Sequence, residues 1–411
     1  MTRPIQDRTP GQREFVVLMA ALMASNALAI DVMLPALPAI GAALPVADPN
    51  DRQFVITFYL FGFGAAQIFY GPLADRFGRK RLLIGAMLAY AAFGALAAFA
   101  GSMTMLLAAR FLQGAAAAAT RVLVVAVVRD RYAGAAMAQI MSLVMIIFMV
   151  VPVLAPSVGQ LILAISDWRE LFLLLALYGL GLALWGGLRM PETLRDENRR
   201  PLSFRTIRAA SGETLTVRAS IGNTIASTLA FGSLFAFIGS IQQIVLDVFR
   251  QPAAIGIVFA CIAGPMALSS YANSRLVLRL GARRLLLLAL MSLTGMALLH
   301  LLIAAVWGET LWSFVILQAM TMACFGLVGA NAGALAMQPV GHIAGTASAI
   351  QGLVTTIGGA LIGMIVGQAF NGTTLPLIAG FSVCGALATL VAFWANPRLI
   401  ETLETEPARP V

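Results

Sequence analysis

The chain has 411 residues, of which 60% are hydrophobic and only 11% are charged. A soluble globular protein of this length usually has about 25% charged residues, so the composition predicts a polytopic membrane protein. The net charge of +9 does not indicate nucleic-acid binding, because the basic residues are scattered over the turns between apolar segments and form no single basic face.

Runs of about 20 apolar residues predict twelve transmembrane helices, because lipid offers no partner for unpaired backbone groups. We expect them at residues 14–38, 53–74, 82–101, 104–128, 137–163, 167–189, 215–240, 252–274, 283–306, 310–337, 343–370 and 373–395. The predicted organisation is an N-terminal six-helix half at 1–189, a cytoplasmic linker at 190–214, a C-terminal six-helix half at 215–397 and a cytoplasmic tail at 398–411.

Basic residues are distributed unequally between the two sides of the membrane that these helices define. Placing both termini in the cytoplasm puts 22 Lys and Arg residues there, whereas the opposite side receives only Arg52, Arg169 and Arg250. Because basic residues concentrate in cytoplasmic loops, we expect both termini inside.

The loop after the second predicted helix has a degenerate copy after the eighth. A shift of 203 residues superposes Gly78 on Gly281 and Arg76 on Arg279. The first copy resembles the loop signature of the major facilitator superfamily in residues Gly71, Leu73, Asp75, Arg76, Gly78, Arg79 and Lys80. The resemblance implies an all-α integral membrane fold of two pseudo-symmetric halves, with a substrate site near the membrane midplane.

A carboxylate in this loop, Asp75, lies at a helix end among basic residues. We predict a conformational latch in which Asp75 pairs with cations such as Arg131, which follows Asp130 at the end of the fourth helix. The alternative is that the basic residues only enforce topology. The latch is favoured because topology alone would require neither Asp75 nor the glycines.

Asp31 is the one carboxylate deep inside a predicted transmembrane segment. A charge at that depth costs several kcal/mol, which makes Asp31 a functional-site hypothesis. Arg110, in a stretch that resembles the fourth-helix signature of the superfamily, lies at a similar depth, about 10 Å below the outer boundary. We expect the two to meet across the N-terminal half and to couple transport to protons, since a nearby guanidinium favours the charged carboxylate and burial favours the neutral acid. The alternative is a structural ion pair of Arg110.

At 3.6 residues per turn, Arg110 shares one face of the fourth helix with Gln113, Gly114 and Arg121. Such a polar stripe must face water or a partner charge, and it predicts a wall of the transport cavity. Arg121 has an alternative interpretation, because its long side chain could instead extend to the cytoplasm.

The fifth predicted helix contains Pro152, Ala155, Pro156 and Gly159. This stretch resembles the fifth-helix signature of antiporters in the superfamily, although Ala155 replaces the usual glycine. Small residues and two missing backbone donors suit a bend or a sliding interface, and a plain kinked helix is the alternative.

Three short stretches, Asp31–Pro38, Arg129–Asp130 and Pro191–Leu194, resemble the Bcr/CflA (bicyclomycin and chloramphenicol resistance) drug/proton antiporters. The resemblance implies a monomeric exporter in the bacterial cytoplasmic membrane that exchanges protons for small lipophilic or cationic drugs, with no cofactor. The alternative within transport is a metabolite transporter for a sugar, nucleoside or amino acid. A membrane enzyme or sensor is a remote alternative, since the chain has no paired carboxylates and no metal-binding or nucleotide-binding motif.

Flexible Met, aromatic and small polar side chains at helical spacing are candidates for a cavity that takes varied bulky cargo. Ordinary helix packing explains the same spacing. The candidates are Tyr59, Met141, Met145, Phe148, Thr228, Phe231, Phe235, Gln351 and Thr355. His300 and His342 show no metal-ligand spacing, so we expect no metal site.

Overall fold

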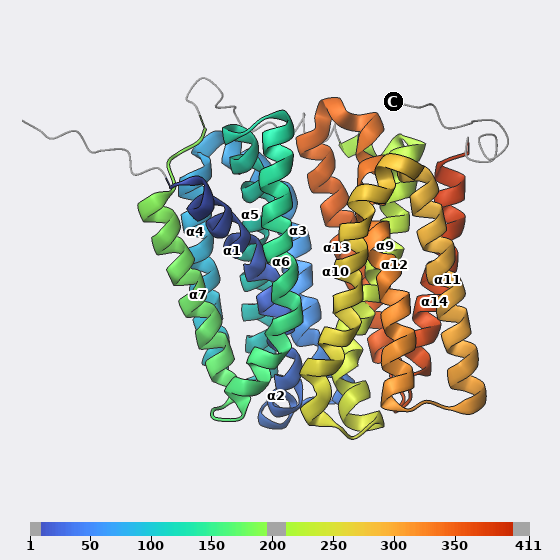
Figure 1. Ribbon diagram of the computed structural model, residues 1–411. Helices are drawn as coiled ribbons and strands as arrows, with labels where there is room; N and C mark the ends of the chain where they lie inside the picture. The colour runs from blue at the N-terminus through green and yellow to red at the C-terminus, as the bar shows by residue number, and fades with distance from the viewer. Residues whose placement is uncertain (1–9, 195–210, 398–411) are drawn as a thin grey trace, which may run out of the picture. The chain divides into compact units, whose positions relative to one another are not determined.

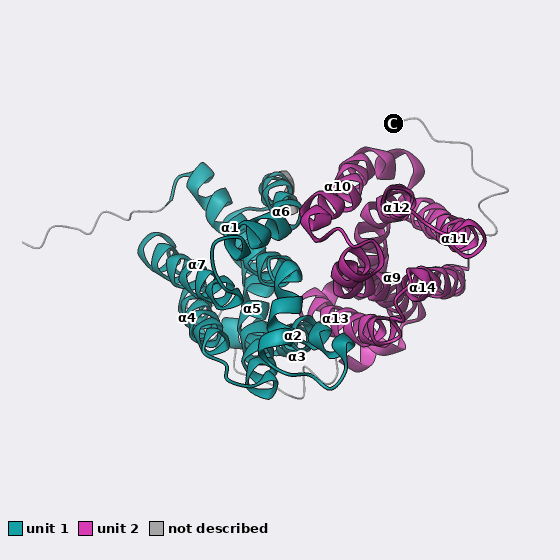
Figure 2. Ribbon diagram, turned by 90° about the horizontal axis from the view of Figure 1, so that it is seen from below, with its two compact units in different colours: residues 1–203 teal, residues 204–411 magenta. Residues whose placement is uncertain are grey.

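The computed structural model describes residues 10–194 and 211–397, so the predicted tail and most of the predicted linker lie outside the described residues. The chain forms two compact units, residues 1–203 and 204–411, which Figure 2 colours separately.

All regular structure in the described part of the chain is helical (Figure 1). Unit 1 contains α1 (Gln12–Asp31), α2 (Leu37–Ala43), α3 (Phe54–Phe77), α4 (Arg79–Ala98), α5 (Met103–Arg131), α6 (Gly134–Leu163) and α7 (Trp168–Arg189). Unit 2 contains α9 (Arg218–Gln243), α10 (Ile255–Leu280), α11 (Ala282–Trp307), α12 (Leu311–Met337), α13 (Ala344–Gln368) and α14 (Leu375–Ala395). Short helical turns join some of these, including Leu34–Ala36, Pro49–Gln53, the π-helical Ile244–Val248, Pro252–Ala254 and Gln338–Ile343.

Eleven stretches of the described residues are long and apolar enough to cross a membrane. One of them, Leu311–Gln368, has 58 residues and contains both α12 and α13, so the long helices agree with the twelve that the sequence predicts. The all-helical membrane fold is therefore confirmed.

The first helix is shorter than the predicted 14–38, because α1 ends at Asp31 and the chain continues through a short turn into α2. Pro35 explains the break, since it has no N–H to donate to the carbonyl of Asp31 four residues earlier. The break places Asp31 at a helix end and not inside a continuous helix.

Gly78 and Gly281, which the internal repeat superposes, occupy equivalent helix junctions in their units. Gly78 separates α3 from α4 with φ +96° and ψ 157°, and Gly281 separates α10 from α11 with φ +75° and ψ 151°. This backbone region is almost exclusive to glycine. The two halves therefore share a backbone device as well as a sequence motif.

Within each unit, long helices pack in pairs: α3 along α5, α4 along α7 and α1 against α6 in unit 1, and α9 along α13 and α14 in unit 2. Small residues allow the close approach that helix association in lipid depends on.

Candidate functional site

Asp31 is the last residue of α1 and is only 4% exposed. In the part of the chain that the structure describes, no hydrogen bond or ion pair neutralises its carboxylate. Buried carboxylates are almost always paired, so an unpaired one at the end of a broken membrane helix is a strong candidate for a functional group.

Arg110 of α5 is completely buried. A buried guanidinium needs hydrogen-bond acceptors for its N–H groups. Arg110 donates to the carbonyl oxygens of Val55 at 3.1 Å and Ala29 at 2.9 Å, and to the Gln113 side-chain oxygen at 2.7 Å. Its charge also lies 4.3 Å from the centroid of the Tyr59 ring. The guanidinium thus connects α5 to α1 and α3 through carbonyl groups and one aromatic face.

The contact with Ala29 closes the broken end of α1. Val32 N–H donates to Leu28 and Met33 N–H to Ile30, so neither takes the Ala29 carbonyl. Arg110 satisfies this carbonyl and places a positive charge at the negative end of the helix dipole. The same interaction stabilises the break after Asp31, at which α1 ends.

The expected direct meeting of Asp31 and Arg110 is not seen. Arg110 reaches α1 at Ala29, two residues before Asp31, and two helical positions lie about 200° apart around the axis. Arg110 therefore contacts the backbone of α1 and not the Asp31 side chain. The structural alternative, an ion pair of Arg110, is not found among the described residues either.

The predicted polar stripe of α5 divides into two environments. Gln113 is completely buried beside Arg110, and its side-chain nitrogen has no partner in the described structure. A Cβ on Gly114 would lie 2.0 Å from the Tyr59 carbonyl oxygen, so Gly114 packs against α3 and lines no cavity. Arg121, two turns further on, is exposed. The stripe is therefore a close helix contact followed by an exposed cation.

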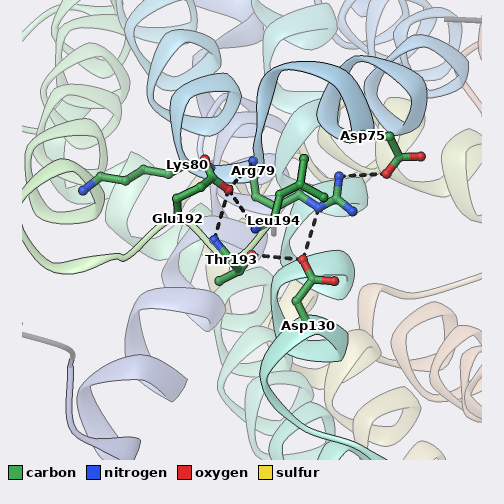
Figure 3. Close-up of polar contacts among 7 residues, drawn as sticks. All are labelled: Asp75, Arg79, Lys80, Asp130, Glu192, Thr193 and Leu194. Carbon is green, nitrogen blue, oxygen red and sulfur yellow. Dashed lines mark hydrogen bonds and ion pairs between the residues drawn. The ribbon is translucent and has the colours of Figure 1, made fainter. Parts of the chain in front are cut away.

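The α3–α4 junction holds an ion-pair cluster, which Figure 3 shows and which we call the latch cluster: Asp75, Arg79 and Asp130. The guanidinium of Arg79 is 5% exposed and lies 2.8 Å from Asp75 and 3.2 Å from Asp130. It joins the end of α3, the start of α4 and the end of α5.

Arg131 is not the partner of Asp75 that the sequence predicted. Its guanidinium lies over the ring of Phe15, 4.7 Å from the centroid, whereas Asp75 pairs with Arg79 one turn further along its own segment. The residues that flank the cluster contribute less: Arg76 is exposed over Phe77, and a Cβ on Gly71 would meet nothing within 4 Å.

Glu192, after the end of α7, is a part of this site that the sequence prediction did not include. Its carboxylate accepts from the backbone N–H groups of Arg79 at 2.8 Å and Lys80 at 3.2 Å, so a residue 113 positions away caps the start of α4 (Figure 3). The hydroxyl of Thr193 donates to Asp130 at 3.0 Å. Both residues belong to the stretch Pro191–Leu194, which resembles the Bcr/CflA proteins.

The proline-containing helix α6 packs against the break in α1. A Cβ on Gly159 would lie 2.3 Å from the carbonyl oxygen of Val32, directly after Asp31. Pro152 and Pro156 lie inside α6, and Ala155 is buried. The antiporter-like stretch therefore contacts the segment that carries the candidate proton site.

The candidate cavity residues are distributed over both units, and several are engaged within their own unit. In unit 1 Tyr59 is completely buried against Arg110, while Met141, Met145 and Phe148 are half-buried. In unit 2 the Gln351 side chain donates to Ser220 and to the Ala336 carbonyl, and Phe235 packs against Gly359 and Gly363. Thr228, Phe231 and Thr355 are half-buried. Their role in binding cargo remains a prediction.

Residues 19–363 match the Major Facilitator Superfamily. The chain belongs to this superfamily. Major facilitator proteins are membrane transporters of small molecules, and this identification makes the chain a multi-pass membrane transporter.

Individual relatives agree with this assignment over almost the whole chain. A bicyclomycin resistance protein homolog from Haemophilus influenzae is 28% identical over 94% of this chain and 97% of its own. The uncharacterized MFS-type transporter YdgK from Bacillus subtilis is 30% identical over 92% and 94%, and the multidrug resistance protein MdtL from Salmonella heidelberg is 28% identical over 94% and 96%. These similarities match the resemblance to Bcr/CflA proteins.

Among solved structures, the crystal structure of the human organic anion transporter MFSD10 (TETRAN) superposes with a TM-score of 0.65. The match covers 94% of this major facilitator chain and 100% of that chain, at 19% sequence identity. At this identity the likeness concerns the fold alone.

Proposed function

We propose that this major facilitator transporter exports small lipophilic or cationic drugs in exchange for protons, with Asp31 as the proton-binding residue. The environment of Asp31 carries the proposal, because its buried carboxylate ends a broken helix and has no neutralising partner in the described residues. Such a carboxylate can bind a proton, or in its ionised form it can interact with a cationic cargo. That exchange is the chemistry an antiporter needs.

Arg110 acts in this proposal by fixing the geometry around Asp31. It is held by carbonyl oxygens of two helices and places a permanent charge at the end of α1 that carries Asp31. A movement of α5 against α1 would change both this charge and the break, and would therefore change the proton affinity of Asp31.

A drug is a better cargo candidate than a sugar for two reasons. Relatives over nearly the full chain are named for bicyclomycin resistance and multidrug resistance. In addition, two amide side chains that would suit sugar hydroxyls are already engaged in unit 2: Asn331 donates to Asn273 at 2.7 Å, and Gln351 to Ser220 at 3.2 Å.

We further propose that the protein is a monomer in the bacterial cytoplasmic membrane, with both termini and the latch cluster on the cytoplasmic side. The distribution of 22 basic residues supports this orientation. In an alternating-access cycle the latch cluster would stabilise one of the states.

Proton release from the lumen of acidified everted membrane vesicles on addition of a drug tests the function, because an antiporter takes the drug into the lumen in exchange for protons. A panel of lipophilic and cationic drugs identifies substrates first, as those to which expressing cells become less susceptible. Asp31→Asn should abolish drug-induced proton release while the protein is still produced and folded. Glu170→Gln removes a carboxylate charge at an exposed position and should behave as wild type. Undiminished proton release in Asp31→Asn would reject the assignment.

A further inference from the structure

A second cluster of ionisable groups lies in unit 2, and the proposed transport mechanism does not use it. The side chains of His300 in α11 and Glu309 after α11 are 1% and 3% exposed, and Nε2 of His300 lies 2.6 Å from one Glu309 oxygen. The Thr374 hydroxyl, before α14, donates to the other oxygen at 2.5 Å. His300 therefore has a specific buried partner, although its sequence surroundings are only apolar.

The backbone brings these groups together at one end of unit 2. Gly308 ends α11 with φ +72° and turns the chain, so that Glu309 returns toward the helix that it has just left. Thr310 then begins α12 with a reciprocal capping box. The Phe314 ring of α12 lies 5.7 Å from the His300 ring. The pair thus joins the end of α11, the start of α12 and the start of α14.

Other charges around the pair are few. The helices that contact α11 are α10, α12 and α14. The other ionisable side chains of these four helices are Arg283 and Arg284 of α11, Cys261, Tyr271, Arg275 and Arg279 of α10, Cys324 of α12 and Cys384 of α14. Asp247 and Arg250 lie between α9 and α10. The nearer arginine of α11, Arg284, lies 16 residues before His300, about 24 Å along the helix. Asp247 and Arg250 flank Phe249, whose ring contacts Phe314 with a centroid distance of 5.7 Å. Glu309 is the one carboxylate bonded to His300.

We propose that His300 and Glu309 form a proton-binding site separate from Asp31, whose occupancy sets how firmly this end of unit 2 is held together. With two protons on the ring, the pair is an ion pair without net charge. When the ring loses one of these protons, the buried Glu309 carboxylate keeps its negative charge. Its hydrogen-bond donors are then all neutral: the ring N–H and the Thr374 hydroxyl. An unneutralised buried charge is costly, so loss of the second ring proton weakens the contacts at this end of unit 2.

The chain offers a matched control, because it contains only two histidines and both are paired with glutamate. His342 lies 2.8 Å from Glu213, but these side chains are 63% and 41% exposed. Surface pairs contribute little to stability, so the two pairs differ mainly in burial. The experiment measures protonation and folding directly and does not depend on transport.

Nitrogen-15 NMR of histidine-labelled protein, purified through a tag without histidine, tests the site. In His342→Gln the remaining signal is that of His300, and we expect its chemical shift to follow the loss of one ring proton over a defined pH range. Glu309→Gln should shift this titration to lower pH by more than Glu213→Gln shifts that of His342. The melting temperature of the wild type and of His342→Gln should fall with rising pH over the same range, and His300→Gln should lose this dependence. A His300 ring that stays in one protonation state, or a His300→Gln protein with the wild-type pH profile, would overturn the proposal. If His300→Gln does not fold, the titration of His300 in His342→Gln still decides it.

Discussion

Arg110 donates to the carbonyl oxygen of Ala29 at 2.9 Å and thereby closes the end of a helix whose last residue, Asp31, is a buried acid without a partner among the described residues. The relationship between the two charges is thus mediated by the helix backbone and not by an ion pair. A change at Arg110 should disturb the break in α1 as well as the electrostatics of the site.

We therefore expect Arg110→Lys to be strongly impaired, although it keeps the charge. An ammonium cannot reproduce the planar set of donors that reaches Ala29, Val55 and Gln113. Each buried acceptor that loses its partner costs about 1–3 kcal/mol, so the melting temperature in detergent should fall together with the transport rate. Arg110→Ala should be worse.

Arg121→Ala provides the comparison on the same helix. The Arg121 side chain has exposed surface and makes no hydrogen bond or ion pair in the described structure, so Arg121→Ala leaves no buried acceptor without a partner and should lower the melting temperature less than Arg110→Ala. It should also impair transport less than Arg110→Ala does. Equal losses of transport in the two variants would move the coupling site away from Arg110.

Glu192→Gln should destabilise the latch cluster without removing either of its ion pairs. The carboxylate accepts from the N–H groups of Arg79 and Lys80 at the start of α4, and replacing a charged cap by a neutral one costs about 1 kcal/mol. We expect a lower melting temperature and slower transport. Glu170→Gln, at an exposed position in the first turn of α7, is the control and should change neither. A Glu192→Gln protein as stable as this control would contradict the capping role.

A comparison of Gly78→Ala with Gly281→Ala separates the cost of backbone strain from the cost of displacing the Glu192 carboxylate that caps α4. Both glycines have a backbone conformation that costs other residues about 1–3 kcal/mol. A Cβ at Gly78 would also come within 2.4 Å of the Glu192 carboxylate, whereas at Gly281 nothing lies within 4 Å. Gly78→Ala should therefore lower the melting temperature more than Gly281→Ala.

A double-mutant cycle tests whether the greater destabilisation by Gly78→Ala comes from its clash with Glu192. In a Glu192→Ala background, Gly78→Ala should cost no more than Gly281→Ala, because the carboxylate that it displaces is gone. Additive effects of Gly78→Ala and Glu192→Ala would show that the two residues act independently.

The sequence was sufficient for features that depend on composition and local pattern. The apolar segments that form the long helices and the burial of Asp31 and Arg110 follow from hydropathy and helical spacing. Pro35 also signalled the break in α1, but the apolar run through residue 38 obscured it. Local chemistry thus predicted which groups are costly to bury.

Partner choice could not be read in the same way. Arg79 pairs with Asp75 because the Gly78 turn brings the start of α4 beside the end of α3, and Arg131 instead meets Phe15. Glu192 reaches Arg79 over 113 positions. Such contacts depend on how the helices pack, and several arginines of the same loop satisfied the sequence pattern equally well.

Gly159→Ala should weaken transport through the contact between α6 and the break in α1. A Cβ there would lie 2.3 Å from the Val32 carbonyl oxygen and 2.9 Å from Pro35, and neither backbone nor proline ring can yield without moving the break. We expect α6 to be displaced, with a cost of about 1–3 kcal/mol and a loss of drug-induced proton release. Gly181→Ala in α7, where a Cβ would meet nothing within 4 Å, should retain wild-type stability and transport. If Gly159→Ala transports like Gly181→Ala, then α6 is a kinked helix without influence on Asp31, and the antiporter-like stretch has only a packing role.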